Sequence, residues 1–349
     1  MDYLLAALLT ALAILGHAAL WVGFINRLNA VPLHYLVLRW INRPAMVACA
    51  VIALLMVAWA CSLFWPHEQV SEKFQLPPAV SATMGLYFRT CWLIAGWAIL
   101  VWLFRRWFDL RWPHIAVIDS KIIDVSKAVG KPLTHGAKAR LCSRLPGNQI
   151  LQFEKRTLEV ALHNLRATLG GLSLVHLSDF HMAGHVGKEY FEEVIKAANH
   201  LDADLMLITG DIFDDLECLS WLNLLGQLES RLGTYFVLGN HDYRVCTPDR
   251  LREILSDLGM HCVAGTHHLI SHNRSQILLV GNELPWHREP PKFDQLPIPP
   301  GDSGVLSIAL SHTPDELDWA RREGFDLMLA GHLHGGQIRL PVIGPVLSP

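Results

Sequence analysis

The 349-residue chain is 51% hydrophobic and 17% charged, with a formal net charge of −3 at pH 7. Soluble domains carry about 25% charged residues, so part of this chain is not expected to face water. The near-neutral balance gives no sign of a nucleic-acid-binding protein, and seven scattered cysteines without a CxxC pair fit neither a disulfide framework nor a zinc ribbon.

Three apolar segments near the N-terminus are long enough to cross a membrane. They are residues 3–24, 45–65 and about 82–104, and only the third contains a charged residue, Arg89, near its start. About 20 apolar residues span the hydrocarbon core, and an arginine near a helix end can reach the interface. The first segment follows Met-Asp, which is not the basic start of a signal peptide. We therefore predict a transmembrane region over residues 1–112.

Basic residues are unevenly distributed among the loops of this region. The loop between the second and third segments has one lysine beside two glutamates, whereas the other two flanks are rich in arginine. Basic loops remain in the cytoplasm, so the rest of the chain is expected on the cytoplasmic side of a cell membrane, with the N-terminus outside. The arginines concerned are Arg27, Arg39, Arg43, Arg105, Arg106 and Arg111.

The second half of the chain alternates between strand-like and helix-like patterns. Residues 113–170 are interpreted as a connector that contains a first strand near 150–160. Further strands are expected at 173–177, 204–209, 234–238, 261–270, 276–281, 304–310 and 325–330. Helices are expected at 188–201, 216–228, 249–259 and 314–324. This alternation predicts an α/β domain over residues 171–349, in which ligands bind beyond the carboxyl ends of the strands.

Side chains with metal-ligating atoms follow five of these strands. Each cluster alone is typical of a turn or helix cap, and a lone histidine such as His312 is usually a hydrogen-bonded structural residue. Five unrelated turns, however, would have no reason to place only nitrogen and oxygen ligands at one edge of a sheet. The residues are Asp179, His181, Asp211, Asn240, His241, His312, His332 and His334.

This ordered set resembles the calcineurin-like metallophosphoesterase family, whose pattern is DxH, GDxxD, GNH(D/E), H and GHxH. The resemblance covers about residues 172–340, and it implies an α/β sandwich of two mixed β-sheets flanked by helices. Family members usually continue well past GHxH, so a closing strand of the second sheet is expected to be missing. The motif residues are Asp179, His181, Gly210, Asp211, Asp214, Gly239, Asn240, His241, Asp242, His312, Gly331, His332 and His334.

The resemblance also implies roles for these residues. Asp179, His181 and His334 would bind one divalent metal ion, and Asn240, His312 and His332 would bind a second. Asp211 would bridge the two ions through both carboxylate oxygens. Mixed imidazole and carboxylate ligands favour Mn, Fe, Zn or Ni over Mg or Ca.

Three further residues of these motifs are expected to act beside the metal ligands. His241 would face the leaving group as a general acid or charged donor. Asp214 and Asp242 would either orient His241 or a ligand, or cap a turn.

The remaining histidines receive structural interpretations. His176 is expected inside a strand and His185 in a solvated loop near the rim of the site. A cluster near a hairpin, with no expected metal role, consists of His267, His268 and His272.

The function that follows is metal-dependent hydrolysis of P–O bonds at a membrane. Membrane-anchored family members are similar to pyrophosphatases that cleave UDP-2,3-diacylglucosamine, so a phosphorylated small molecule or lipid-linked substrate in lipid metabolism is expected, with membrane lipids as partners. Two alternatives remain open: a phosphodiesterase acting on soluble nucleotides, and a membrane receptor or scaffold whose phosphoesterase domain only binds a ligand.

Overall fold

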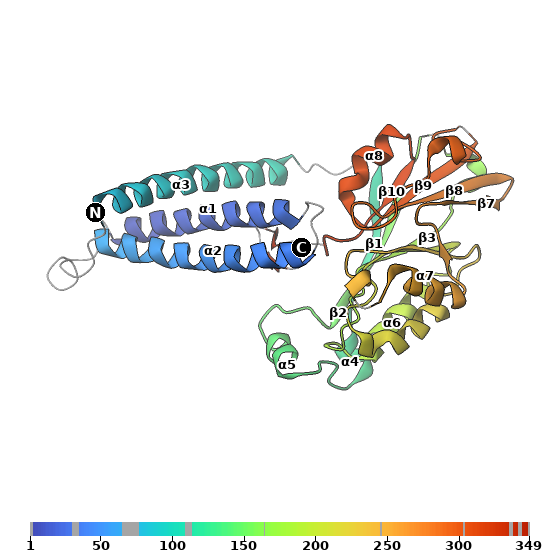
Figure 1. Cartoon of the computed structure of the whole chain (residues 1–349), viewed down its shortest axis with the longest axis horizontal. Coiled ribbons are helices and arrows are strands. Elements are labelled where there is room, and N and C mark those ends of the chain that lie inside the picture. The colour runs from blue at the N-terminus through green and yellow to red at the C-terminus, as the bar shows by residue number, and fades with distance from the viewer. Residues whose placement is uncertain are drawn as a thin grey trace. The chain divides into compact units, whose positions relative to one another are not determined.

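A computed structural model describes residues 3–29, 35–64, 77–108, 114–163, 165–244, 246–302, 304–334, 338–340 and 344–347 (Figure 1). The chain divides into two compact units. Unit 1 comprises residues 1–111 together with 333–349, and unit 2 comprises residues 112–332.

Unit 1 contains three long apolar helices, α1 (Tyr3–Asn29), α2 (Tyr35–Phe64) and α3 (Pro78–Trp107). Windows at Tyr3–Leu28, Trp40–Ser62 and Pro78–Phe104 are long and apolar enough to cross a membrane. The three apolar helices expected from the sequence are therefore present, each somewhat longer than predicted. Two short strands, β11 (Ile338–Leu340) and β12 (Gly344–Leu347), form a separate antiparallel pair.

Close packing and a few polar contacts hold the three helices together. Ala13, Met56 and Phe88 belong to their buried core. Gly16 lies so close to the carbonyl of Cys91 that a Cβ would collide with it, so only glycine allows this approach of α1 to α3. His17 is buried among the helices, and its Nδ1 lies 2.7 Å from the hydroxyl of Tyr87.

Unit 2 is built on two four-stranded sheets. The first has the order β3-β4-β5-β6 and is parallel throughout. The second has the order β10-β9-β8-β7, with β7 antiparallel to β8 and the other pairs parallel. The α/β sandwich is therefore confirmed, but only the second sheet is mixed. The strands are β3 (Leu174–Leu177), β4 (Leu205–Thr209), β5 (Thr234–Val237), β6 (His261–Cys262), β7 (His267–His272), β8 (Ser275–Asn282), β9 (Val305–Ser311) and β10 (Leu327–Leu329).

Helices cover the face of the first sheet that points away from the second, with α6 (Lys188–Asn199) and α7 (Pro248–Asp257) visible there in Figure 1. Between the sheets lies a core of aliphatic side chains such as Leu207, Val237 and Ile308. A second core, which includes Phe191, Phe236 and Leu251, lies between the first sheet and its helices. Burial of these alternating strand faces is what fixes the two-layer arrangement.

The expected helix at 216–228 is present as the 3-10 helix η2 (Leu216–Gln227). Further short elements are η1 (Ala167–Leu169), η3 (Asp242–Arg244), η4 (Phe293–Gln295), η5 (Pro314–Glu316) and α8 (Leu317–Arg322).

Residues 115–160 form a module that precedes the two sheets. β1 (Ile115–Asp124) pairs antiparallel with β2 (Gln152–Val160), and α4 (Val125–Val129) and α5 (Ala137–Ser143) connect them. The strand expected near 150–160 is present, but it pairs with β1 in a sheet of its own instead of entering a sheet of the sandwich. Among the described residues, β10 is the outermost strand on its side of the second sheet.

Candidate metal centre

Side chains that follow five strand ends meet at one edge of the two sheets. Asp179 and His181 follow β3, Asp211 follows β4, and His312 follows β9 directly. Asn240 and His241 come shortly after β5, and His332 and His334 shortly after β10. Because most of these strands run parallel, their carboxyl ends bring distant segments of sequence to the same place.

The structure brings the predicted ligands together in two groups that share one carboxylate. In the first, Asp179, His181, Asp211 and His334 each offer a ligand atom, and these atoms lie within 4.8 Å of one another. His181 Nε2 lies 3.4 Å from Asp211 Oδ2 and 3.9 Å from Asp179 Oδ1. The spacing of this group is suitable for one metal ion.

The second group contains Asp211, His312 and His332. His312 Nε2 lies 3.3 Å from Asp211 Oδ2 and 3.2 Å from His332 Nδ1. The side-chain oxygen of Asn240 lies 3.1 Å from His312 Nε2 as well. All four residues predicted for the second metal therefore surround one point.

Asp211 joins the two groups through a single oxygen. Its Oδ2 faces both His181 Nε2 and His312 Nε2, whereas its Oδ1 accepts the backbone N–H of His241 at 2.8 Å. The expectation that both carboxylate oxygens bridge the metals differs from this geometry. The backbone amide of His241 occupies Oδ1 and orients the carboxylate, so that Oδ2 alone faces both groups.

The hydrogen bonds around the imidazoles of His312 and His181 test whether these ligands fit a metal. His312 Nδ1 lies 2.7 Å from the carbonyl of Thr209, which can only accept, so the ring proton is on Nδ1. Likewise, His181 Nδ1 donates to Asp214 Oδ2 at 3.0 Å. Both Nε2 lone pairs thus face other acceptors, and a cation is the group that satisfies such a set.

Electrostatics at His312 leads to the same conclusion. Burial lowers the pKa of this imidazole, but the Asp211 carboxylate more than offsets that effect, and the pKa is raised to about 9. A proton on Nε2 would serve as a small stand-in for a metal cation. The site therefore favours positive charge at this position, and a metal must compete with a proton there.

The backbone is strained at five of the predicted ligands. Left-handed conformations of non-glycine residues cost about 1–3 kcal/mol each and cluster at functional sites. Here the strain turns the chain sharply at the strand ends, so that side chains from successive turns converge. The φ angles are 55° at Asp179, 44° at His181, 54° at Asp211, 70° at His332 and 47° at His334.

Two motif glycines are required by close approaches to these ligands. A Cβ on Gly239 would collide with Asp211 Oδ1 and its backbone nitrogen, and would also contact His312 Nδ1. A Cβ on Gly331 would collide with the side chains of Ser178 and Asp179. The glycines of the GN and GH pairs thus leave room for neighbouring ligands.

Asp214 links two histidines of the site. Its Oδ1 lies 2.7 Å from His241 Nδ1 and its Oδ2 lies 3.0 Å from His181 Nδ1. Burial raises the pKa of Asp214, but the hydrogen bonds from both histidines hold it well below the usual value for aspartate. Asp214 thus carries a negative charge that orients both rings. This agrees with the expectation that it orients His241 or a ligand, rather than with the alternative that it caps a turn.

Asp242 has a different role from the orientation of His241. Its buried carboxylate accepts three backbone N–H groups, from Asp211 at 2.9 Å, Ile212 at 2.7 Å and Gly239 at 2.7 Å. Burial and the nearby Asp211 carboxylate raise its pKa to about 7. Asp242 therefore joins the turns after β4 and β5, which is closer to the capping alternative.

The sequence pattern did not identify Trp286, which contacts the second group. Its ring centroid lies 5.6 Å from that of His312 and 5.1 Å from that of His332. The adjacent His287 places Nε2 3.0 Å from the carbonyl of Gly239. No motif marks this segment, and the only signal in the sequence is a Trp–His pair after a buried strand.

The other histidines lie outside the metal-binding groups. His176 is in β3 and its Nε2 lies 2.8 Å from the hydroxyl of Thr209, while His185 is exposed. On β7, His268 stacks on His261 with ring centroids 5.3 Å apart. His267 and His272, also on β7, belong to no metal-binding group among the described residues.

Fold and side chains together define a metal-binding α/β sandwich with a shared carboxylate at its centre. Residues 172–336 match the family model of the calcineurin-like phosphoesterases. Members of this family hydrolyse phosphoester bonds.

Curated relatives are similar over the same part of the chain. A transmembrane protein with metallophosphoesterase domain from Danio rerio is 28% identical over 55% of this chain and 47% of its own length. The protein of the same description from Bos taurus is 31% identical over 55% of this chain and 47% of its own length. Phosphodiesterase YaeI from Escherichia coli is 29% identical over 50% of this chain and 65% of its own length. The chain thus spans about half to two thirds of the length of these relatives.

Proposed function

We propose that this protein is a membrane-anchored phosphoesterase that uses two divalent metal ions. Asp179, His181 and His334 would hold one ion, and Asn240, His312 and His332 the other, with Asp211 shared. The observation that carries the proposal is the position of Asp211 Oδ2, at 3.4 Å from His181 Nε2 and 3.3 Å from His312 Nε2. Two cations close together repel, so an anion between them is what such a site requires.

The bound ions would act as Lewis acids toward phosphoryl oxygens and lower the pKa of water. The chain's own residues would bind and orient. The hydrogen bond from His241 Nδ1 to Asp214 fixes the ring, which leaves Nε2 to donate to the leaving group. Trp286 would cover the second metal group and limit the access of bulk water to it.

Membrane attachment is the second part of the proposal. Three helices are long and apolar enough to span a bilayer, and two relatives are named transmembrane proteins. The arginine-rich loops favour a cytoplasmic location for the phosphoesterase domain. Residues 1–112 would form the membrane region, 113–170 a connector, and 171–349 the catalytic part.

A lipid-linked phosphate is the substrate class we favour, such as UDP-2,3-diacylglucosamine, with manganese as a suitable metal. Three spans exceed what a tether needs, and a site held at the bilayer meets lipid-borne substrates at a high local concentration. The runner-up is a phosphodiesterase acting on soluble nucleotides, which the name of the Escherichia coli relative favours. A ligand-binding receptor is less well supported, because such a role does not require Asp211, Asn240 and His241 together.

A comparison of substrates tests the proposal. The full chain in detergent micelles would be stripped of metal, reloaded with Mn²⁺, and assayed with UDP-diacylglucosamine and with an aryl phosphodiester. We expect metal-dependent hydrolysis of both, with the higher kcat/KM for the lipid substrate. A preference for cyclic or linear nucleotides would support the runner-up. Absence of turnover on every substrate, despite two bound metals, would favour the receptor.

A further inference from the structure

The module at residues 115–160 exposes aliphatic side chains that no described residue covers. Isolated two-stranded sheets are marginally stable in water, so a large apolar surface on one requires a cover. In the β1–β2 pair, Val117 is 60% exposed and lies opposite Leu158, which is 47% exposed. Ile115 lies opposite Val160 in the same hairpin and is also exposed.

The segment between the two strands is strongly basic. No acidic residue lies between Asp124 and Glu154, whereas this stretch contains five lysines and arginines. Over residues 115–160 there are eight Lys and Arg against four Asp and Glu, a net charge of +4 in a chain whose total is −3. The module is therefore basic, in contrast to the acidic remainder of unit 2.

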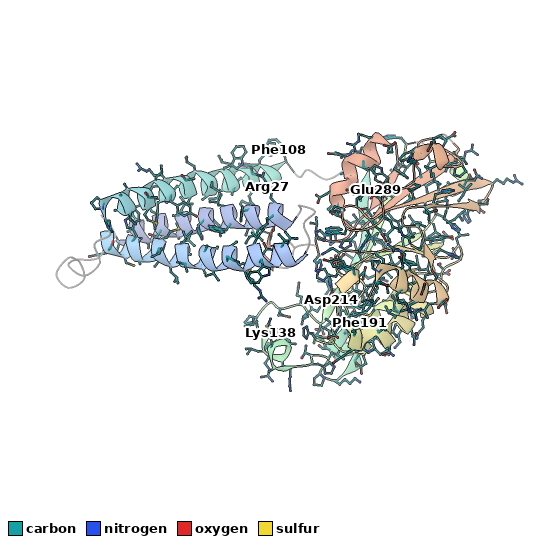
Figure 2. All side chains as sticks on the ribbon, viewed as in Figure 1. Arg27, Phe108, Lys138, Phe191, Asp214 and Glu289 are labelled. Carbon is teal, nitrogen blue, oxygen red and sulfur yellow. The ribbon has the colours of Figure 1, made fainter. Side chains whose placement is uncertain are left out.

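Helix α5 combines both properties. It has no buried residue, and Leu141 and, just beyond its end, Leu145 are 68% and 57% exposed. Lys138, Arg140 and Arg144 lie on the same short segment, and none of them forms an ion pair within the described part of the chain. Figure 2 shows Lys138 on an arm that projects from the rest of unit 2. Leucines beside cations are typical of elements that bind the bilayer interface.

The base of this arm is firmly attached to the phosphoesterase domain. Leu133 is buried, and its carbonyl accepts the backbone N–H of Gly187 at 2.7 Å. The backbone N–H of His135 donates to the carbonyl of His185 at 2.9 Å, and Lys131 forms an ion pair with Glu189. These contacts fix the module to the loop that follows Asp179 and His181, so the exposed leucines are not part of a loose tail.

We propose that the 115–160 module binds the surface of an anionic lipid bilayer. Lys138, Arg140 and Arg144 would contact lipid phosphates, and Leu141 and Leu145 would enter the headgroup region. An anionic bilayer is inferred because its charge complements that of the module and because the connection to α3 is short. β1 begins eight residues after α3 ends. An extended chain of that length reaches at most about 30 Å, so the module stays near the membrane that α3 spans. This proposal rests on the membrane-spanning role proposed above.

Hydrogen exchange of the full chain tests the proposal. The protein would be placed in nanodiscs of phosphatidylcholine alone, in nanodiscs with equal parts phosphatidylcholine and phosphatidylglycerol, and in detergent micelles. Each cation near an anionic surface strengthens binding about fivefold and three together about a hundredfold, so amides at 136–150 should exchange at least about tenfold more slowly in the anionic nanodiscs. Amides of α1, α2 and α3 should be protected in both nanodiscs, which reports the spans independently.

Two variants complete the test. Replacing Leu141 and Leu145 together by Asp should remove the lipid-dependent protection, whereas Leu216→Asp, at a similarly exposed leucine elsewhere in unit 2, should leave it intact. Equal exchange at 136–150 in all three environments would overturn the proposal. Protection that is as strong in micelles as in anionic nanodiscs would also overturn it, and would assign the surface to a protein contact. Exchange of the α1–α3 amides in nanodiscs would instead refute the proposed spans.

Discussion

Asp211 and His241 are held together by a hydrogen bond, yet they present different atoms to the site. Asp211 directs Oδ2 between two imidazole nitrogens, while its Oδ1 accepts the His241 amide. The His241 ring is held by Asp214. Removal of the Asp211 side chain deletes a shared anion, whereas removal of the His241 side chain deletes a ring that Asp214 orients. The two substitutions should therefore have separable effects.

Asp211→Ala should abolish nearly all turnover and the binding of at least one metal ion, because two cations would lose their common anion. His241→Ala should retain both ions and lower turnover by about 10²–10⁴-fold, the usual contribution of a positioned acid. That loss should shrink for an aryl phosphodiester, whose leaving group hardly needs protonation. Metal analysis and kinetics of both variants provide the measurement. Loss of metal from His241→Ala equal to that from Asp211→Ala would make His241 a ligand and contradict the mechanism.

Asp242 is the residue whose removal should damage the fold most at this edge. Asp242→Ala leaves the buried amides of Asp211, Ile212 and Gly239 without an acceptor, and each such group costs about 1–3 kcal/mol. We expect a large fall in thermal stability and weaker metal binding together. Asp215→Ala, at the half-buried cap of η2, is the control and should change stability by only about 1 kcal/mol. An Asp242→Ala protein with wild-type melting temperature would refute the proposed role.

At the scale of elements, the sequence predicted the strands well and their surroundings less well. Continuous apolar runs placed β4, β5 and β9, because strands buried on both faces consist almost entirely of apolar residues. The separate β1–β2 sheet escaped prediction, because strand pairing depends on long-range register. The 3-10 geometry of η2 was also missed, since helical spacing of apolar residues does not distinguish it from an α-helix.

The site, too, was predicted only in part from the sequence. Motif residues identified which side chains gather, and the structure brings all of the predicted ligands together. Spacing could not show that Asp211 presents a single oxygen, because the amide of His241 decides its orientation. It also could not reveal Trp286, which reaches the second group from the segment after β8.

A repeated hydrogen-bond pattern at the start of the parallel strands leads to a prediction about pH. Asp204 accepts the backbone N–H and the hydroxyl of Ser173, both at 2.9 Å, and pairs with Arg231. Asp326 accepts the same two groups from Ser307 in the second sheet. Burial raises the pKa of Asp204, but these hydrogen bonds more than offset it, and the pKa is lowered.

A lowered pKa means that Asp204 stabilises the fold above the unfolded-state pKa, about 4, and loses this effect as the pH falls through the folded-state value. Asp204→Asn should therefore reduce the free energy of unfolding by about 1–3 kcal/mol at pH 7, and by less as the pH drops below about 4. Asp202→Asn removes an exposed partner of the same Arg231 and should have little effect. Thermal unfolding of the detergent-solubilised chain at several pH values measures both. A pH-independent difference would contradict the prediction.

At the scale of the whole molecule, two kinds of sequence coexist in one chain. Helices α1, α2 and α3 expose many leucines and tryptophans, as expected for surfaces that face lipid. Residues 112–332 bury their apolar side chains between sheets and helices, as water-soluble domains do. Arginine-rich sequence lies at the transition between the two. Such sequence helps to predict on which side of the membrane the second unit lies.

The positive charges flanking the first and third helices predict a cytoplasmic phosphoesterase domain. Cys142 is the best native reporter, because it lies on α5 and is partly exposed, whereas Cys218 is buried. A membrane-impermeant maleimide should leave Cys142 unlabelled in intact cells and label it after permeabilisation. Cys142→Ser identifies the signal, since it should remove the labelling seen after permeabilisation. Labelling of Cys142 in intact cells would reverse the topology, and it would mean either that one of the three helices does not span or that the arginine-rich loops face outward.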